Sequence, residues 1–185
     1  MTEVGKNMKI PKYLQFPLMV FIAIVMASIY GALHDQVSYT VSQEYFTLFK
    51  YIQFQVDTLS VPARVKAGII GVLATWYMGL PIGLFLGVTG LKAARQEYFG
   101  LCIRSFGVVI LIAALTGIIG LAYGWFFASH DPGDYHGWFI PDGLKHTRNF
   151  LSVGYMHNFS YLGGATGLAA GAIWQYFALK GIKKQ

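Results

Sequence analysis

The chain has 185 residues, of which 55% are hydrophobic and only 12% are charged. Because about 25% charged residues is usual for a soluble domain, this composition argues against a water-soluble enzyme, and 16% aromatic residues argue against a disordered chain. Its one cysteine, Cys102, excludes an internal disulfide, a thiolate zinc cluster and a two-cysteine redox couple. The sequence therefore predicts a membrane protein.

Four uncharged apolar runs are long enough to cross a bilayer, since about 20 helical residues span a hydrocarbon core of roughly 30 Å. They are residues 16–33, 67–91, 105–129 and 158–179. The first run follows lysines, as in a signal peptide, but residues 30–35 make a poor cleavage site, so we expect a retained span. Because backbone groups in lipid must be satisfied internally, the fold class is an all-α integral membrane protein. We expect four transmembrane helices in a single membrane domain, 1–185.

Basic residues predict the orientation, because positively charged loops stay on the cytoplasmic side. The amino tail, the second loop and the carboxyl tail hold nine basic and two acidic residues, whereas the other two loops hold five basic and six acidic residues. The nine basic residues are Lys6, Lys9, Lys12, Lys92, Arg95, Arg104, Lys180, Lys183 and Lys184. Both termini are therefore predicted to be cytoplasmic. The net charge of +6 is accounted for by topology and the lipid bilayer, with no role for nucleic acid.

Glycines recur at every fourth position on the second and fourth apolar runs. The two triplets are Gly79, Gly83, Gly87 and Gly163, Gly167, Gly171. Small residues one turn apart allow helix backbones to approach closely in lipid, so we expect them at helix contacts. A duplicated helical hairpin would explain why the second and fourth runs share this spacing. A homo-oligomeric pore is a further interpretation of the same triplets.

The two outer loops carry structural signals of their own. Ser42 is a plausible helix N-cap. Five apolar residues after it fall on one face at helical spacing: Tyr45, Leu48, Phe49, Ile52 and Val56. This pattern predicts an amphipathic helix in the membrane interface. The second outer loop, 130–157, is rich in turn-forming residues, and we expect it to be structured, with a helix after Gly143 that continues into the fourth span.

All five histidines fall on the predicted outer side, together with six carboxylates. They are His34, His130, His136, His146 and His157. Imidazole and carboxylate are ligands for zinc, iron and copper, and a haem ligand is a further option. No HExxH or similar pair is present, so a metal site would have to be assembled from separate helices.

The expected ligands are His34, His130 and His157, with Glu44 or Asp35 as the carboxylate. His136 and His146 are weaker candidates. His146 and His157 would lie about 16 Å apart along one helix, because each residue adds about 1.5 Å, and the two could not share an ion.

Glu44 is the candidate catalytic residue of this set, as a bridging ligand or a base. Asn158, which follows His157, and Tyr161, one helical turn after it, are candidates to orient a ligand through hydrogen bonds. A structural interpretation stands beside each of these: histidines at a membrane boundary often cap helices, and a carboxylate in a first helical turn is stabilised by the helix dipole. The residue types alone leave both interpretations open.

The block HDQVSYTVSQEYF, residues 34–46, resembles a family of small uncharacterised bacterial four-helix membrane proteins. The resemblance covers the first outer loop and implies a bacterial inner-membrane protein. It draws attention to His34, Asp35 and Glu44, and it implies no cofactor, substrate or activity.

Two functions of different classes therefore remain. The first is a membrane protein with a periplasm-facing histidine and carboxylate cluster that binds a transition metal and supports redox or hydrolytic chemistry. The second is a non-catalytic accessory or structural subunit of a larger membrane complex. The homo-oligomeric pore ranks behind both. A transporter is disfavoured, because transporters usually need an ionisable residue near the middle of a span, and the four runs contain none.

Overall fold

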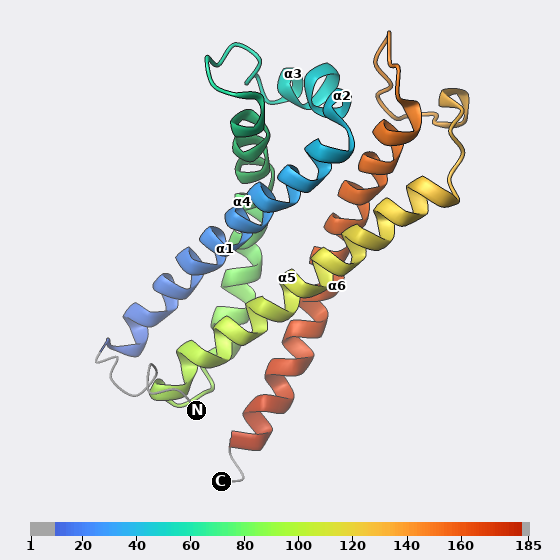
Figure 1. Ribbon diagram of the computed structural model, residues 1–185. Helices are drawn as coiled ribbons and strands as arrows, with labels where there is room; N and C mark the ends of the chain where they lie inside the picture. Colours follow the sequence, from blue (N-terminus) through green and yellow to red (C-terminus); the bar gives the residue numbers. More distant parts are fainter. Residues whose placement is uncertain (1–9, 183–185) are drawn as a thin grey trace.

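The computed structural model describes residues 10–182, and every regular element in that range is helical (Figure 1). Four long helices make up most of it: α1 (Lys12–Val41), α4 (Ala63–Gly90), α5 (Arg95–Phe126) and α6 (Thr147–Ile182). Shorter elements come after α1 and α5: α2 (Gln43–Tyr45), η2 (Phe46–Lys50), α3 (Tyr51–Gln53) and η3 (Pro132–Asp134). The basic residues predicted to orient the tails at Lys6, Lys9, Lys183 and Lys184 lie outside the described residues.

Three of the long helices are long and apolar enough to cross a membrane, over Tyr13–Val41, Ala63–Gly90 and Arg95–Phe126. This confirms the all-helical, membrane-type class predicted from the composition. Helix α1 continues eight residues past the predicted end of the first run at Leu33. The helix continues through this more polar stretch because Asp35 and Ser38 are buried against protein instead of lipid.

The long helices form two antiparallel pairs, α1 with α4 and α5 with α6 (Figure 1). Glycines make both pairs close. A Cβ on Gly79 would lie 2.6 Å from the Cα of Ile24, and one on Gly167 would lie 3.0 Å from the Cα of Val109. The predicted packing role of the glycine triplets is thus confirmed. Both triplets face a neighbouring helix of the same chain, so they give a homo-oligomeric pore no support.

The two ends of the molecule differ in what they carry. The start of α1, the short turn between α4 and α5, and the end of α6 lie at one end (Figure 1). There the Arg95 side chain donates a hydrogen bond to the carbonyl of Ile10, over 3.1 Å. The opposite end, which we call the loop end, carries the first connecting segment, 42–62, and the second, 127–146.

The first connecting segment begins as predicted, because the Ser42 hydroxyl accepts a hydrogen bond from the Tyr45 amide at 3.2 Å. After Phe46, the predicted apolar face of this segment is wrong. Tyr51 is buried, whereas Ile52 is 62% exposed. The cause is the π-helical turn η2, in which the Tyr51 amide bonds to the carbonyl of Phe46. Such a turn inserts one extra residue and rotates the later residues around the helix axis.

The second connecting segment is structured, as its turn residues predicted. The Asp131 carboxylate accepts a hydrogen bond from the Gly133 amide at 2.9 Å and so caps η3. Gly143 has a φ of +74°, a conformation that favours glycine. The chain then enters α6 at Thr147, eleven residues before the predicted fourth run begins. Side chains of this segment and the first pack with α4 and α6 in one core that includes Phe46, Tyr135 and Phe150.

Candidate functional site

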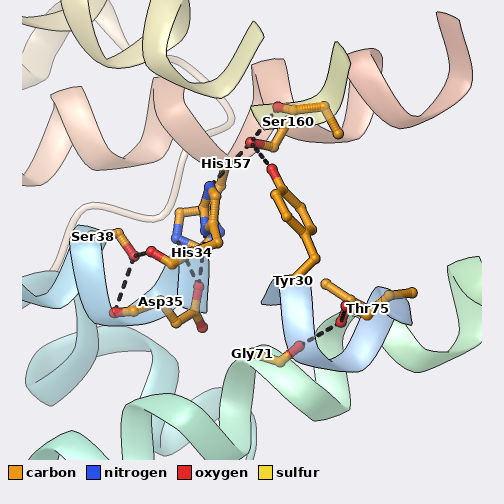
Figure 2. Close-up of polar contacts among 10 residues, drawn as sticks. Tyr30, His34, Asp35, Ser38, Gly71, Thr75, His157 and Ser160 are labelled. Atoms are coloured by element: carbon orange, nitrogen blue, oxygen red, sulfur yellow. Dashed lines mark hydrogen bonds and ion pairs between the residues drawn. The ribbon is translucent and has the colours of Figure 1, made fainter. Parts of the chain in front are cut away.

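Two histidines and an aspartate meet where the two helix pairs face each other, near the loop end (Figure 2). His34 and Asp35 come from α1 and His157 from α6. His34 Nδ1 lies 3.1 Å from Asp35 Oδ1, and His157 Nε2 lies 3.7 Å from the same oxygen. One ligand atom from each residue lies within 4.8 Å of the other two. We call these three residues the His34 cluster.

The cluster is buried and held by aromatic neighbours. Asp35 is 2% exposed and His157 is 6% exposed. The two imidazole rings meet edge to face, with centroids 4.7 Å apart. The Tyr45 ring stacks on the His157 ring, with centroids 5.0 Å apart. Since Tyr45 belongs to the first connecting segment, that segment covers the cluster on the loop side.

Two buried polar atoms of the cluster have no hydrogen-bond partner among residues 10–182. They are Asp35 Oδ2 and His157 Nε2. A buried polar atom without a partner costs roughly 1–3 kcal/mol, so such atoms are uncommon in folded proteins. Both belong to residues whose side chains can bind a metal ion. The cluster therefore has unused ligand capacity at the point where α1 meets α6.

Ser160 and Tyr30 extend the cluster into a hydrogen-bonded network over three helices (Figure 2). Ser160 Oγ lies 3.0 Å from His34 Nε2 and accepts a hydrogen bond from the Tyr30 hydroxyl at 3.2 Å. It also donates to the carbonyl of Ala113, on α5, over 3.4 Å. The contact with Ser160 therefore fixes the orientation of the His34 ring through Nε2.

The sequence contained a signal for this network. Ser160 is three residues after His157 and Tyr30 is four before His34, spacings that place both pairs on common helix faces. The residues singled out instead were Asn158 and Tyr161. Asn158 is exposed, and Tyr161 lies beside the cluster.

A cavity of about 70 Å³ adjoins the cluster. All four long helices line it, and its walls are mostly apolar: Ala27, Ala74, Met78, Ile82, Val109 and Ala113. His34, Asp35, His157 and Ser160 form its polar side. Because one water molecule occupies about 30 Å³ of liquid, the space suits a few waters or a comparably small ligand.

The other expected ligands lie elsewhere. His130 is exposed on the second connecting segment, with Nε2 3.2 Å from the carbonyl oxygen of Gly124. His136 is exposed further along that segment. The structure thus brings together His34, Asp35 and His157 but not His130, His136, His146 or Glu44.

Glu44 and His146 form a separate contact at the loop end. The Glu44 carboxylate accepts hydrogen bonds from the backbone amides of Lys145 and His146, at 3.0 and 2.8 Å, and lies 3.1 Å from the His146 ring. Partial burial by itself would raise the pKa of Glu44, but the hydrogen bonds outweigh it and leave the pKa below its ordinary value. Glu44 therefore ties the first connecting segment to the start of α6.

Two imidazoles and a carboxylate are a donor set typical of zinc, iron and copper sites. Within residues 10–182, these side chains form the one group of histidine, cysteine, aspartate and glutamate with ligand atoms so close together. No protein-family model, curated protein or solved structure matches the chain. Its function must therefore be inferred from the chemistry of the site.

Proposed function

We propose that this chain is a four-helix bacterial inner-membrane protein whose His34 cluster binds a single transition metal ion. The observation that carries the proposal is the meeting of three ligand-type side chains from two helices, with Asp35 and His157 buried and each having a polar atom without a hydrogen-bond partner among the described residues. A bound cation would remove the cost of leaving Asp35 Oδ2 and His157 Nε2 unsatisfied. It would also balance a carboxylate buried among apolar helices.

The spacing of the three ligand atoms suits one ion. Two ligands bound about 2.1 Å from an ion lie about 3.0 to 3.4 Å apart in octahedral or tetrahedral geometry. Asp35 Oδ1 lies 3.1 Å from His34 Nδ1, within that range, and 3.7 Å from His157 Nε2, while all three ligand atoms lie within 4.8 Å of one another, so side-chain rotations that bring the two imidazoles closer would complete the site. Iron, copper and zinc all accept these ligands. A haem fits poorly, because the cavity of about 70 Å³ is smaller than sites of roughly 300 Å³ and above for drug-sized ligands.

The ligand count favours a reactive site over a purely structural one. Structural zinc sites use four protein ligands, whereas catalytic sites commonly use three and leave a position open. Here the open position would face the cavity. An ion held there would act as a Lewis acid or a redox centre on a small molecule, or on the small polar end of a molecule that enters from the lipid.

We further propose that α6 forms the fourth span and that both termini are cytoplasmic. Helix α6 covers the apolar run 158–179 and packs along α5. Among the described residues, Lys92, Arg95 and Lys180 belong to the end at which α1 starts and α6 finishes. Basic residues concentrate on the cytoplasmic side, so the loop end and the His34 cluster would face the periplasm.

Metal analysis of the purified full-length protein tests the metal proposal. We expect close to one equivalent of iron, copper or zinc per chain in the wild type and in His136→Ala, whose exposed histidine serves as the matched control. We expect less than a tenth of that in His34→Ala and His157→Ala. Sub-stoichiometric metal in the wild type would refute the proposal.

Loss of metal through misfolding has to be distinguished from loss of a ligand. The wild-type protein should be stripped with a chelator and then reloaded with each ion. A ligand that binds only the folded state raises the melting temperature in proportion to the logarithm of its concentration. We expect that increase in the wild type and in His136→Ala, and no increase in folded His157→Gln. An equal increase in all three proteins would contradict the assignment.

The accessory-subunit function remains the alternative, because the same network joins α1 to α6 and α5 through Tyr30, His34 and Ser160. On that alternative the network is a helix-to-helix contact only. It predicts metal-free wild-type protein that purifies with larger partners and a His34→Ala variant that is less stable.

A further inference from the structure

A second pocket lies at the loop end, separate from the cavity beside the His34 cluster. Its volume is about 270 Å³, and its walls come from the first connecting segment, the second connecting segment and α6. The principal lining residues are Tyr45, Phe49, Lys50, Trp138, Phe139 and Asn158. The pocket thus combines aromatic walls with one ammonium group and one amide.

The aromatic walls are fixed by packing. A Cβ on Gly154 would lie 2.4 Å from the Trp138 ring, so the absence of a side chain there allows the indole to lie against α6. The Trp138 ring also meets the Tyr135 ring edge to face at 5.2 Å. Phe49 and Phe139 pack at 5.1 Å across the two connecting segments. A ligand would therefore enter a site that is already formed.

Lys50 supplies the charge of this pocket. Its ammonium donates one hydrogen bond, to the Gln53 amide oxygen at 2.8 Å, and lies 4.4 Å from the centre of the Phe49 ring. Among residues 10–182, no carboxylate forms an ion pair with it. An ammonium has three N–H donors, so donors remain for a ligand. Burial lowers the pKa of Lys50 to about 8, which leaves the side chain mostly charged at neutral pH.

Asn158 lines the pocket from α6 and adds a neutral hydrogen-bonding group. It is exposed and belongs to α6. The positive charge of Lys50 makes the pocket unsuited to a cationic ligand, although aromatic walls alone would favour one. An anion with several acceptor oxygens suits the combination of ammonium and amide.

We propose that this pocket binds the phosphate group of an anionic lipid, with Lys50 contributing charge and Asn158 a hydrogen bond. The position of the pocket favours a lipid over a soluble phosphate. It lies at one end of helices long and apolar enough to cross a membrane. Phe139, which lines it, and Ile52, on the same segment as Lys50, are 56% and 62% exposed and offer apolar surface to the glycerol and acyl parts. Basic pockets between transmembrane helices bind anionic head groups on the cytoplasmic side of membranes, and the same charge attraction would act at the loop end.

Lipid titration of the purified full-length protein in detergent, followed by native mass spectrometry, tests the proposal. The probes are phosphatidylglycerol, phosphatidylcholine as a zwitterionic reference, and inorganic phosphate. We expect phosphatidylglycerol to bind at least tenfold more tightly than phosphatidylcholine. Equal binding of the two lipids would overturn the proposal, and displacement of phosphatidylglycerol by an equal concentration of inorganic phosphate would overturn the lipid as the source.

Two variants and one control locate the binding to this pocket. Lys50→Gln should lower the affinity for phosphatidylglycerol at least tenfold. Lys145→Gln, which removes an exposed lysine at the same end, should change it less than twofold. Asn158→Asp keeps Lys50 but adds a negative charge at an exposed position, and it should weaken binding several-fold. Equal affinities for Lys50→Gln and Lys145→Gln in proteins of unchanged melting temperature would overturn the assignment. The outcome does not depend on whether the His34 cluster binds a metal.

Discussion

At His34, the direction of the Ser160 hydrogen bond decides which ring nitrogen is free to bind an ion. A serine hydroxyl has two acceptor positions and one proton. If Tyr30 O–H and His34 Nε2–H both donate to Ser160 Oγ, and Ser160 donates to the Ala113 carbonyl, every position is used. His34 Nδ1 then carries no proton, and its lone pair is available to an ion held between it and Asp35. Ser160 would therefore hold the tautomer that a metal needs.

The variant Ser160→Ala tests this role. Partners that orient a metal-binding histidine typically contribute 10- to 100-fold to metal affinity, so we expect at least tenfold weaker binding in a metal titration. Ser152→Ala is the matched control, because Ser152 is also buried on α6 and its hydroxyl donates to the Arg148 carbonyl of the same helix, away from the cluster. Equal affinities in the two variants would show that Ser160 does not orient His34.

Glu44 gives a second prediction at this scale. Replacing it with glutamine removes the charge that holds the amides of Lys145 and His146, so we expect Glu44→Gln to lower the free energy of unfolding by about 1 kcal/mol at pH 7, as loss of a helix cap does. Asp57→Asn, at an exposed carboxylate on the same segment, should have no measurable effect.

The pH dependence of this effect is set by the lowered pKa of Glu44. A carboxylate with a lower pKa in the folded state stabilises that state above its ordinary pKa of 4.5. The stabilisation is lost as the pH falls through the folded-state value. Unfolding curves of wild type and Glu44→Gln should therefore differ at pH 7 and converge as the pH falls below 4.5. A difference that grows on acidification would contradict this account.

At the scale of the elements, helices were predictable where the surrounding lipid alone determines the secondary structure. Lipid forces long apolar runs to be helical, and α1, α4 and α5, which are long and apolar enough to cross a membrane, agree with that rule. The register after Phe46 was not predictable, because a regular period of 3.6 residues cannot anticipate the π-helical turn that buries Tyr51 and exposes Ile52. Propensity alone does not reveal where such a turn falls.

The regular structure of long helices made only part of the site predictable. His34 and His157 lie on long helices, so their meeting is a consequence of how the helices pack. The position of His130 depends on the chain after Phe126, where the helix has ended and no helical period applies. Glu44 bonds to backbone amides of a distant segment, a contact that residue types alone do not reveal.

The glycine contact between α1 and α4 gives a prediction at the element scale. A Cβ on Gly79 would lie 2.6 Å from the Ile24 backbone, whereas one on Gly107 of α5 would meet nothing within 4 Å. We expect Gly79→Ala to destabilise the protein by about 1–3 kcal/mol, the usual cost of overpacking. Gly107→Ala should be neutral or slightly stabilising, because alanine favours a helix more than glycine does. Equal melting temperatures in detergent for the two variants would argue against close packing at Gly79.

At the scale of the whole molecule, two close helix pairs meet at a seam that has polar contacts near both ends, with Gln175 of α6 bonded to Thr89 and to the Leu86 carbonyl of α4 at the end opposite the loops. Within each pair, glycines allow backbone contact. Between the pairs, the network of Tyr30, His34 and Ser160 joins α1 to α5 and α6. The cavity lies along this seam, lined by all four long helices. Any movement of one pair against the other would therefore change the His34 cluster and its cavity together.

The orientation of the molecule is testable with single cysteines. In a background of Cys102→Ser, Asp142→Cys at the loop end and Gln96→Cys at the opposite end each place a thiol at an exposed position. If both termini are cytoplasmic, a membrane-impermeant maleimide added to spheroplasts should label Asp142→Cys at once. Gln96→Cys should be labelled only after the membrane is permeabilised. The reverse pattern would place the His34 cluster on the cytoplasmic side. Labelling of both thiols in sealed spheroplasts would mean that the helices between them do not cross the membrane.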